Sequence, residues 1–390
     1  MNNDFKTLCG LCSPNTSYPP QITNVSNWHN ILQLAIRHKV VPVLANRMKL
    51  LEISPPEKIS QLITQHVKQN LLNGMKQTSE LIKLTELFDN QDISFLVFKG
   101  IAFNHLAGIE LTQRHMGDID ILLADYDDFE KTDIALKNFG YQRLTLPSII
   151  SMNEHQKRHQ KRHLKRYEKD IIYYHPEKEI SLELHFKLFL SEKMLPLPIS
   201  EIYKARSQIK IGKALIPVMN KADHLLYLLV HGSVCRWFRL KWLCDIPLLS
   251  NNGLDYQSPT FMKRAESLGI ERMVYQGLKL SHELLKMPIA PESYFNKKYS
   301  QQSSFLINQA KASMLAEEQQ NIPRLKKVQS LIRLTVCYLP VLRTDFSYKF
   351  DYFRSYLIKV SDWEDLPLPS PLFWLYYPLR PILWLRRQLK

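Results

Sequence analysis

Glycine is scarce in this chain, which has 11 glycines among 390 residues. Neither G-x-G-x-x-G nor G-x-x-x-x-G-K-[ST] occurs anywhere in the sequence. Both patterns form loops whose backbone amides bind the phosphates of dinucleotides or nucleotides. Their absence argues against a dinucleotide-binding domain and a P-loop, so a phosphate site in this chain must be built in another way.

Cysteine is also rare, and the five cysteines form an odd, scattered set: Cys9, Cys12, Cys235, Cys244 and Cys337. Such a set is not the paired framework of a small disulfide-rich domain. Cys9 and Cys12 form a C-x-x-C motif without a second pair, whereas a zinc site needs two more ligands nearby. The motif alone therefore does not predict a structural zinc site.

Long hydrophobic runs are missing as well. No segment approaches the roughly 18 to 20 apolar residues that span a bilayer. The N-terminal sequence MNNDFKTLCGLC lacks a basic segment followed by an apolar one, so we expect no signal peptide. From these observations we expect a cytoplasmic protein without an integral membrane segment.

The overall composition is that of an ordinary globular protein, with 45% hydrophobic and 23% charged residues. The formal net charge is +15, because 52 Lys and Arg outnumber 37 Asp and Glu. A charge of this sign favours polyanionic or phosphorylated partners, or an anionic membrane surface. Composition does not choose among these partners.

Hydrophobic periodicity divides the chain into four parts. Helical patterns dominate residues 1–90, strand patterns appear in 91–215, helical patterns return in 216–358, and 359–390 is a proline-rich tail with aromatic and basic residues. We therefore predict an α+β fold in which a small mixed sheet is flanked by N-terminal and C-terminal helical regions.

The individual elements follow from the same patterns. A long amphipathic helix is expected at about 57–89. In the central region we expect strands at 93–100 and 118–124, a helix at 126–141, and hairpins at 169–189 and 209–219. Further helices are expected at 221–232, 239–250, 259–267 and 270–286, with two more up to about 358.

The segment RHMGDIDILLADYDD (114–128) holds the first motif that suggests chemistry. Asp118 and Asp120 are two positions apart at the start of a strand, so their side chains share one face. Two neighbouring carboxylates repel each other, and Mg²⁺ between or beside them relieves that repulsion. The alternative is that the motif is only the polar mouth of a strand.

A possible phosphate site precedes these aspartates. FLVFKG reads as a strand that ends at Lys99-Gly100 and is followed by a helix. A glycine there lets a phosphate approach the backbone, and a helix N-terminus offers free N–H groups. Lys99 and Arg114 can each add a positive charge for a triphosphate. For Lys99 the alternative is a surface lysine at a strand end.

A third carboxylate comes from the alternating strand SLELHFKL. Leu182 and Leu184 face one side of this strand, and Glu183 and His185 do not. Glu183 is a candidate metal ligand, or the general base that takes a proton from an acceptor hydroxyl. The alternative is an exposed glutamate on a strand.

These segments together resemble a known family. A strand followed by KG and a helix, then RHMGDIDIL, an acidic helix ending in FGY, and LELHF are similar to the uncharacterised nucleotidyltransferase family, which has the DNA polymerase β-type fold. The helical segment HLLYLLVHGSVCRWFRLKWLCDIPLL (224–249) resembles the segment that follows the core in that family. The resemblance covers the chain from about Trp28 onward.

The resemblance implies transfer of a nucleoside monophosphate from an NTP, with two Mg²⁺ ions and release of pyrophosphate; Mn²⁺ is the alternative ion. Gly100 matches the motif glycine, and Asp118 and Asp120 match the paired metal ligands. Glu183 lies where the third carboxylate is expected. The chain has Lys99-Gly100 where the broader superfamily has Gly-Ser, so it lacks the serine hydroxyl that would hold a phosphate.

Other polar residues lie near the end of one predicted helix. All four of these residues can face the nucleotide triphosphate or the acceptor: His231, Arg236, Arg239 and Lys241. The alternative for His231 is a core histidine at a helix end. Asp245 lies among apolar residues, and we expect it to pair with a nearby Arg or Lys rather than join the site.

Two basic segments suggest larger partners. The run HQKRHQKRHLKR, within residues 155–169, can hold nucleic acid phosphates or be a solvated helix face. The tail 372–390 combines aromatic and basic residues, as a membrane interface does. A C-terminal segment that docks on the helical domain is the alternative, because two prolines should break a long amphipathic helix there.

The sequence thus predicts a Mg²⁺-dependent nucleotidyltransferase that acts on an unidentified acceptor hydroxyl or phosphate. Nucleotide-side residues would be Lys99, Gly100, Arg114, His231 and Arg236. A small-molecule, sugar or peptide acceptor is favoured over nucleic acid. Two other functions stay open: a non-catalytic module that binds nucleotide or a partner, and a basic protein associated with RNA or a membrane surface.

Overall fold

The fold is described from a computed structural model. It describes residues 3–15, 27–144, 165, 168–250, 255–256, 258–288, 297–316, 329–330, 333–355, 362, 365–366, 368 and 370–389. Most of the basic run at 155–169 lies outside these described residues, and so does part of the tail.

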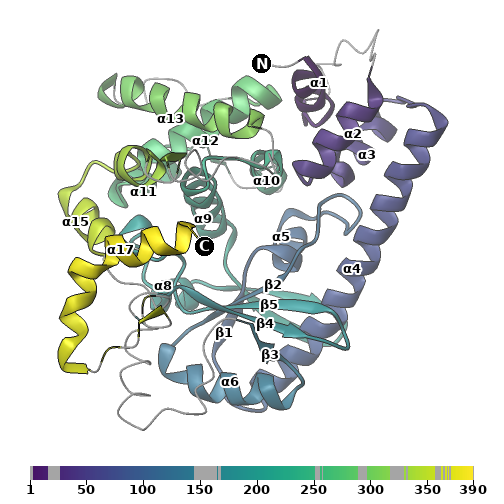
Figure 1. Ribbon diagram of the computed structural model, residues 1–390. Coiled ribbons are helices and arrows are strands. Elements are labelled where there is room, and N and C mark those ends of the chain that lie inside the picture. The colour runs from purple at the N-terminus through teal and green to yellow at the C-terminus, as the bar shows by residue number, and fades with distance from the viewer. Residues whose placement is uncertain are drawn as a thin grey trace.

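The N-terminal region is helical. Its helices are α1 (Asn3–Leu11), α2 (Trp28–Arg37), α3 (Val41–Leu50) and α4 (Glu57–Asp89). The helix α4 begins directly after Pro56, which has an extended ψ of 144° and loses no helical hydrogen bond, because the first N–H groups of a helix have no partner within it. Its bounds match the predicted ones. Figure 1 shows α4 running along the side of the sheet, where it packs on β7, α5 and α6.

The centre of the molecule is a mixed sheet with the order β3-β4-β5-β2-β1-β7-β6. The strands are β1 (Phe95–Val97), β2 (Ile119–Leu123), β3 (Gln142–Arg143), β4 (Asp170–His175), β5 (Ile180–His185), β6 (Ser207–Ile211) and β7 (Ala214–Val218). Strand β2 runs parallel to β5 and antiparallel to β1, and β1 runs parallel to β7. The predicted hairpins are β4–β5 and β6–β7.

The two central strands are completely buried. All three residues of β1 and all five of β2 are shielded from solvent. The strand β1 is shorter than the predicted 93–100, because the chain leaves the sheet after Val97 and turns at Lys99, where φ is 61°. This early turn places the residues after β1 directly beside the strand β2.

Helices α5 (Gly100–Ala107) and α6 (Phe129–Asn138) belong to the central region. The predicted helix at 126–141 is split into a short 3-10 turn, η1 (Tyr126–Asp128), followed by α6. Asp125 accepts a hydrogen bond from the backbone N–H of Asp127 and so fixes this turn.

The C-terminal region is again helical. The short helix α8 (Ile199–Lys204) lies between β5 and β6. The helices that follow the sheet are α9 (Lys221–Val234), α10 (Leu240–Ser250), α11 (Pro259–Ser267), α12 (Glu271–Leu285), α13 (Lys297–Leu315), α15 (Phe346–Ser355) and α17 (Tyr376–Leu389). Short helical turns are η3 (Glu192–Met194), η5 (Leu334–Tyr338), η6 (Leu339–Val341) and η7 (Ser370–Leu375). Figure 1 shows α1–α3 and α9–α13 together at one end of the molecule and α6 at the other.

One buried tryptophan organises these helices. Trp237 is completely buried in the turn after α9. A Cβ added at Gly232 would lie 2.4 Å from its ring, and one added at Gly277 would lie 2.8 Å from it. These two glycines therefore make room for the indole between α9 and α12, which pack on each other.

The tail differs from its prediction in one respect. Pro378 lies in the first turn of α17 and Pro381 lies inside it, and the helix continues through both. A proline in the first turn removes no helical hydrogen bond, and Pro381 removes one. Among the described residues, Arg380 and Arg387 of α17 form ion pairs with Asp362.

The predicted α+β class is confirmed: a mixed sheet lies between N-terminal and C-terminal helical regions. No helix within the described residues has the length and apolar character needed to cross a bilayer. Cys9 and Cys12 are both buried in the main core. Cys12 also contacts Cys244 of α10, so the C-x-x-C motif takes part in helix packing.

Candidate active site

The register between β2 and β5 creates the site. Asp120 lies directly opposite Glu183, and Leu122 lies opposite His185. Side chains two residues apart on a strand share a face, so Glu183 and His185 point the same way as Asp120. Ligand atoms of these three residues all lie within 4.8 Å of one another. Two strands that are far apart in the sequence thus build one polar cluster on one face of the sheet.

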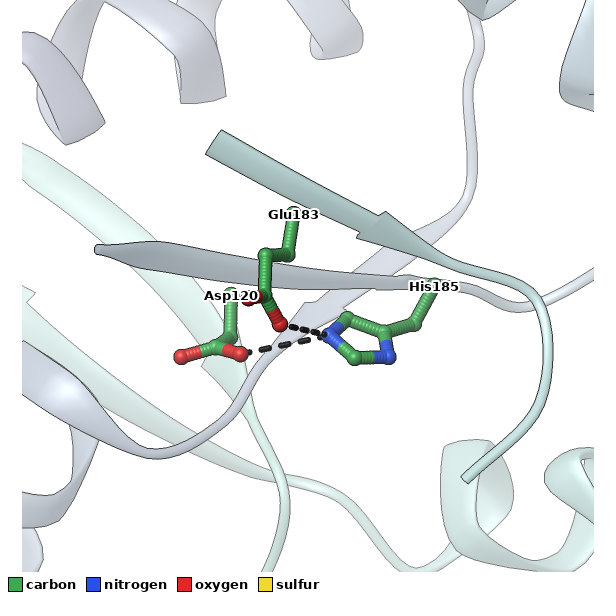
Figure 2. Close-up of side chains that lie close together, drawn as sticks. All are labelled: Asp120, Glu183 and His185. Carbon is green, nitrogen blue, oxygen red and sulfur yellow. Dashed lines mark hydrogen bonds and ion pairs between the residues drawn. The ribbon is translucent and has the colours of Figure 1, made fainter. Parts of the chain in front are cut away.

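The imidazole of His185 lies beside the two carboxylates and directs one ring nitrogen at both, as Figure 2 shows. Its Nε2 is 3.2 Å from Asp120 Oδ1 and 3.1 Å from Glu183 Oε2. The ring of Phe98 packs edge-on against it with centroids 4.9 Å apart. His185 is completely buried, so its orientation is fixed by these contacts.

Lys99 closes the cluster from the end of β1. Its Nζ is 2.6 Å from Asp120 Oδ1 and 3.9 Å from Glu183 Oε2. Burial alone would lower the pKa of this lysine, but Asp120, Tyr227 and Glu183 outweigh burial and raise it well above its usual value. Lys99 therefore stays charged beside the two carboxylates.

Asp118 completes the acidic group. Burial raises the pKa of its carboxyl to about 6, and repulsion from Asp120 and Glu183 adds to the effect. A hydrogen bond to Glu183 raises it further. Asp118 thus lies directly before β2 and contacts Glu183, whereas the group whose ligand atoms all lie within 4.8 Å of one another consists of Asp120, Glu183 and His185.

The other two carboxyl groups are stabilised in their charged forms. Burial would raise the pKa of Asp120, but Lys99 and His185 outweigh it and hold that pKa below its usual value. A hydrogen bond from His185 is the largest influence on Glu183 and lowers its pKa strongly. Asp118 is the one member of the group whose charge is disfavoured.

Gly100 brings the start of α5 against this group. Its φ is +39°, and a Cβ added to it would lie 3.3 Å from the backbone oxygen of Asp118. The first N–H groups of a helix have no partner within that helix and can bind a phosphate. The glycine therefore permits a close approach between α5 and the strand that carries the aspartates.

Arg114 is bound elsewhere. Its Nε and Nη2 donate to the two carboxylate oxygens of Asp245 at 2.7 and 2.9 Å, and its guanidinium lies 4.2 Å from the ring centre of Phe103. The pairing predicted for Asp245 is confirmed. Arg114 can therefore act on a nucleotide only through its charge.

His231 does not contact the acidic group directly, because the ring of Tyr227 lies between His231 and Lys99. It stacks on Tyr227 with centroids 5.6 Å apart, and the Tyr227 ring in turn lies 5.5 Å from Lys99 Nζ. Burial and the charge of Lys99 lower the pKa of His231 to about 3, so the ring is neutral. Arg236 lies in the turn after α9, where φ is 53°.

A group of basic residues around His115 and Lys241 adds positive charge near Asp118. Burial lowers the pKa of His115 to about 3, helped by the charges of Lys241, Lys39, Arg114 and Arg239. Burial also lowers the pKa of Lys241 to about 7, and Arg114 contributes to that effect. Asp118 and Asp245 oppose it. Phosphate groups near Asp118 would meet a positive potential from this side.

Sequence reasoning missed two contributors to the site, His185 and His224. The signal for His185 was its spacing of two from Glu183 on an alternating strand. His224 is completely buried, and its Nε2 accepts a hydrogen bond from the backbone N–H of Lys99 at 3.2 Å. No local pattern marks it, because its partner is 125 residues away.

The donor set fits a hard divalent cation. Asp118, Asp120 and Glu183 offer carboxylate oxygens, which Mg²⁺ and Mn²⁺ prefer. Burial is the main cause of the raised pKa of Asp118, and repulsion from Asp120 and Glu183 adds to it; a divalent cation would relieve that repulsion. His185 adds a nitrogen, which suits Mn²⁺ better than Mg²⁺.

The family comparison agrees with the geometry. Residues 24–286 match a family model described as uncharacterised nucleotidyltransferase. One similar solved structure is that of an antigenic nucleotidyltransferase-like protein from Paracoccidioides brasiliensis, with 13% sequence identity and a TM-score of 0.34. That similarity covers 56% of this chain and 95% of the other. No curated protein matches the chain.

Proposed function

Because the chain belongs to the uncharacterised nucleotidyltransferase family, we propose that it transfers a nucleoside monophosphate from an NTP to a hydroxyl or phosphate group of an acceptor. One observation carries this proposal: ligand atoms of Asp120, Glu183 and His185, on the neighbouring strands β2 and β5, lie within 4.8 Å of one another, and Asp118 directly precedes β2. The start of α5 lies beside them. Carboxylates next to a helix N-terminus can serve both a divalent cation and a phosphate chain.

The reaction would be an in-line substitution at the α-phosphorus. The acceptor oxygen forms a bond to that phosphorus, and the bond to the oxygen that bridges the α- and β-phosphorus breaks. Pyrophosphate leaves with the electron pair of that bond. A hydroxyl acceptor gives its proton to a carboxylate, for which Glu183 is our candidate base.

The cofactor would be Mg²⁺ or Mn²⁺, held by Asp118, Asp120 and Glu183. When bound, such an ion supplies Lewis acidity and neutralises charge on the phosphates. The chain itself would position the nucleotide: the first N–H groups of α5 bind phosphate, and Gly100 lets it approach. His231 and Arg236 are our candidates for contacts further along the nucleotide.

The acceptor is the least defined partner. We favour a small molecule, a sugar or a peptide over nucleic acid. The basic run that would bind a nucleic acid lies mostly outside the described residues. An NTP substrate suits the cytoplasmic location expected from the sequence.

The decisive experiment is a screen of NTPs against acceptor pools. Purified protein is incubated with Mg²⁺ or Mn²⁺ and each NTP, and pyrophosphate and mass-shifted products are measured. The test variant carries Asp118→Ala and Asp120→Ala. The matched control is Asp127→Asn, which removes an exposed carboxylate shortly after the same strand.

Product that the double variant no longer makes, and that Asp127→Asn still makes, supports the proposal. Equal product from the wild type and the double variant contradicts it. Nucleotide binding without pyrophosphate release from any pool supports a non-catalytic binding module instead.

A further inference from the structure

The ammonium group of Lys99 contacts the carboxylates of the site, whereas the sequence suggested that it would bind the triphosphate. Its Nζ lies 2.6 Å from Asp120 and 3.9 Å from Glu183, which are direct neighbours across β2 and β5. A positive charge between two such carboxylates relieves their mutual repulsion, which a bound metal cation would otherwise have to relieve. The lysine therefore neutralises part of the acidic group from within the chain.

The backbone holds this side chain in place. Lys99 has a φ of 61° and a ψ of −159°, a conformation that non-glycine residues rarely adopt. Its N–H donates to the buried Nε2 of His224. A strained conformation persists where its surroundings determine it, and such strain gathers at functional sites.

Two aromatic rings hold the ammonium group from other sides. Its Nζ is 5.0 Å from the ring centre of Phe98 and 5.5 Å from that of Tyr227. Cation–π contacts of this kind stabilise a desolvated ammonium group. The side chain of Lys99 is only 19% exposed. Lys99 is thus fixed by the backbone, by rings and by carboxylates together.

The single positive charge of Lys99 does not balance the three carboxylates of the site, so one further cation can bind there. Asp118, Asp120 and Glu183 can carry three negative charges. Among the described residues, Lys99 is the only Lys or Arg whose charged group lies within 4.0 Å of any of them. Lys99 and His185 both contact Oδ1 of Asp120, so their contacts do not use the Oδ2 atom or Asp118.

We propose that the ammonium group of Lys99 permanently takes one of the two cation positions of this site, so that each chain binds a single divalent ion. The inference rests on the proposed function, and it revises the expectation of two Mg²⁺ ions. Lys99 would then be a positioning residue that neutralises charge on Asp120 and Glu183, and the divalent ion would use Asp118 and the remaining oxygens.

The test counts bound ions and needs no turnover. Mn²⁺ is titrated into nucleotide-free protein, and free Mn²⁺ is measured by electron paramagnetic resonance. We expect one Mn²⁺ per wild-type chain. Lys99→Met removes the charge and leaves an unbranched side chain only one heavy atom shorter. This variant should bind two ions, or one ion at least about tenfold more tightly, since one positive charge no longer opposes it.

Two further variants serve as controls. Lys99→Arg keeps the charge and should still bind one ion. Lys210→Met makes the same change of net charge on an exposed residue of β6 and should bind Mn²⁺ as the wild type does. Thermal unfolding shows whether each variant folds.

Two Mn²⁺ ions per wild-type chain, or none, would overturn the inference, and that result does not depend on any variant. Equal stoichiometry and affinity in folded Lys99→Met and wild type would overturn it as well. The outcomes are separable from those of the NTP screen. If each chain binds one ion but no product forms in the NTP screen, only the proposed function is contradicted. If product forms and each chain binds two ions, only the role of Lys99 is contradicted.

Discussion

Arg114 and Asp245 form a bidentate ion pair that joins the segment before β2 to helix α10, across 131 residues of sequence. Both side chains are almost fully buried, with 4% and 1% of their surface exposed. The pair therefore connects the segment that carries Asp118 to the C-terminal helices.

Removing one member of this pair should destabilise the protein strongly. Asp245→Ala leaves a buried guanidinium without its partner, and we expect it to lower the free energy of unfolding by about 3–5 kcal/mol. Denaturant unfolding measures the effect. The double variant Arg114→Met, Asp245→Leu should be more stable than Asp245→Ala, because no unpaired charge remains. A loss below about 1 kcal/mol in Asp245→Ala would mean that the pair is no stronger than an exposed one.

His185 should support the cation site through its hydrogen bonds to Asp120 and Glu183. We expect His185→Gln to weaken Mn²⁺ binding about 10- to 100-fold, as is typical when a group that orients or binds a metal ligand is lost. Calorimetric titration with Mn²⁺ measures this change. The control is His105→Gln on the exposed face of α5. Unchanged affinity in His185→Gln would show that the imidazole only fills space.

Gly100 and Gly212 offer a matched pair for testing the approach of α5 to Asp118. Both have positive φ, +39° and +61°, but an added Cβ at Gly212 meets nothing within 4 Å. Alanine at either site should cost about 1–2 kcal/mol of stability from backbone strain. Only Gly100→Ala should also weaken Mn²⁺ binding, because its Cβ would press on the backbone of Asp118. Equal Mn²⁺ affinities in the two variants would exclude that role.

Asp118 should make stability depend on pH. Its pKa is raised from 3.8 to about 6, so the folded state holds this proton more tightly than the unfolded chain does. The resulting stability is fully present below the unfolded pKa of 3.8 and is lost as pH rises through about 6. An Asp118→Asn variant carries an amide at this position, and an amide cannot titrate in this range.

The measurement compares the free energies of unfolding of wild type and Asp118→Asn. Between about pH 4 and pH 7 the wild type should lose up to about 3 kcal/mol relative to the variant, since one pKa unit is worth about 1.4 kcal/mol. Saturating Mg²⁺ should remove most of this loss. A constant difference across the range would contradict the raised pKa.

Several elements could be predicted from the sequence because their causes are local. The bounds of α4 follow from the proline pair and from an amphipathic period, and the hairpin β4–β5 follows from alternation around a turn. The proximity of Asp120 and Glu183 could be expected only through the family resemblance. Their pairing depends on the parallel register of β2 and β5, which no local pattern encodes.

The contacts of Lys99 could not be predicted for a similar reason. Its side-chain direction depends on a φ of 61°, and that conformation depends on His224 in a distant helix. Sequence patterns indicate that a lysine ends the strand, but not that it turns back toward Asp120. Arg114 shows the converse case, since its partner Asp245 was expected to pair with some basic residue but not with this one.

The position of His185 has one further consequence. In the neutral ring Nε2 carries at most one hydrogen, yet it lies at hydrogen-bond distance from both Asp120 Oδ1 and Glu183 Oε2. The two carboxylates therefore compete for a single hydrogen. Lys99 also donates to Asp120 Oδ1, so the N–H of a neutral imidazole can point to Glu183 while Asp120 keeps a hydrogen-bond partner, and this one ring links two adjacent strands.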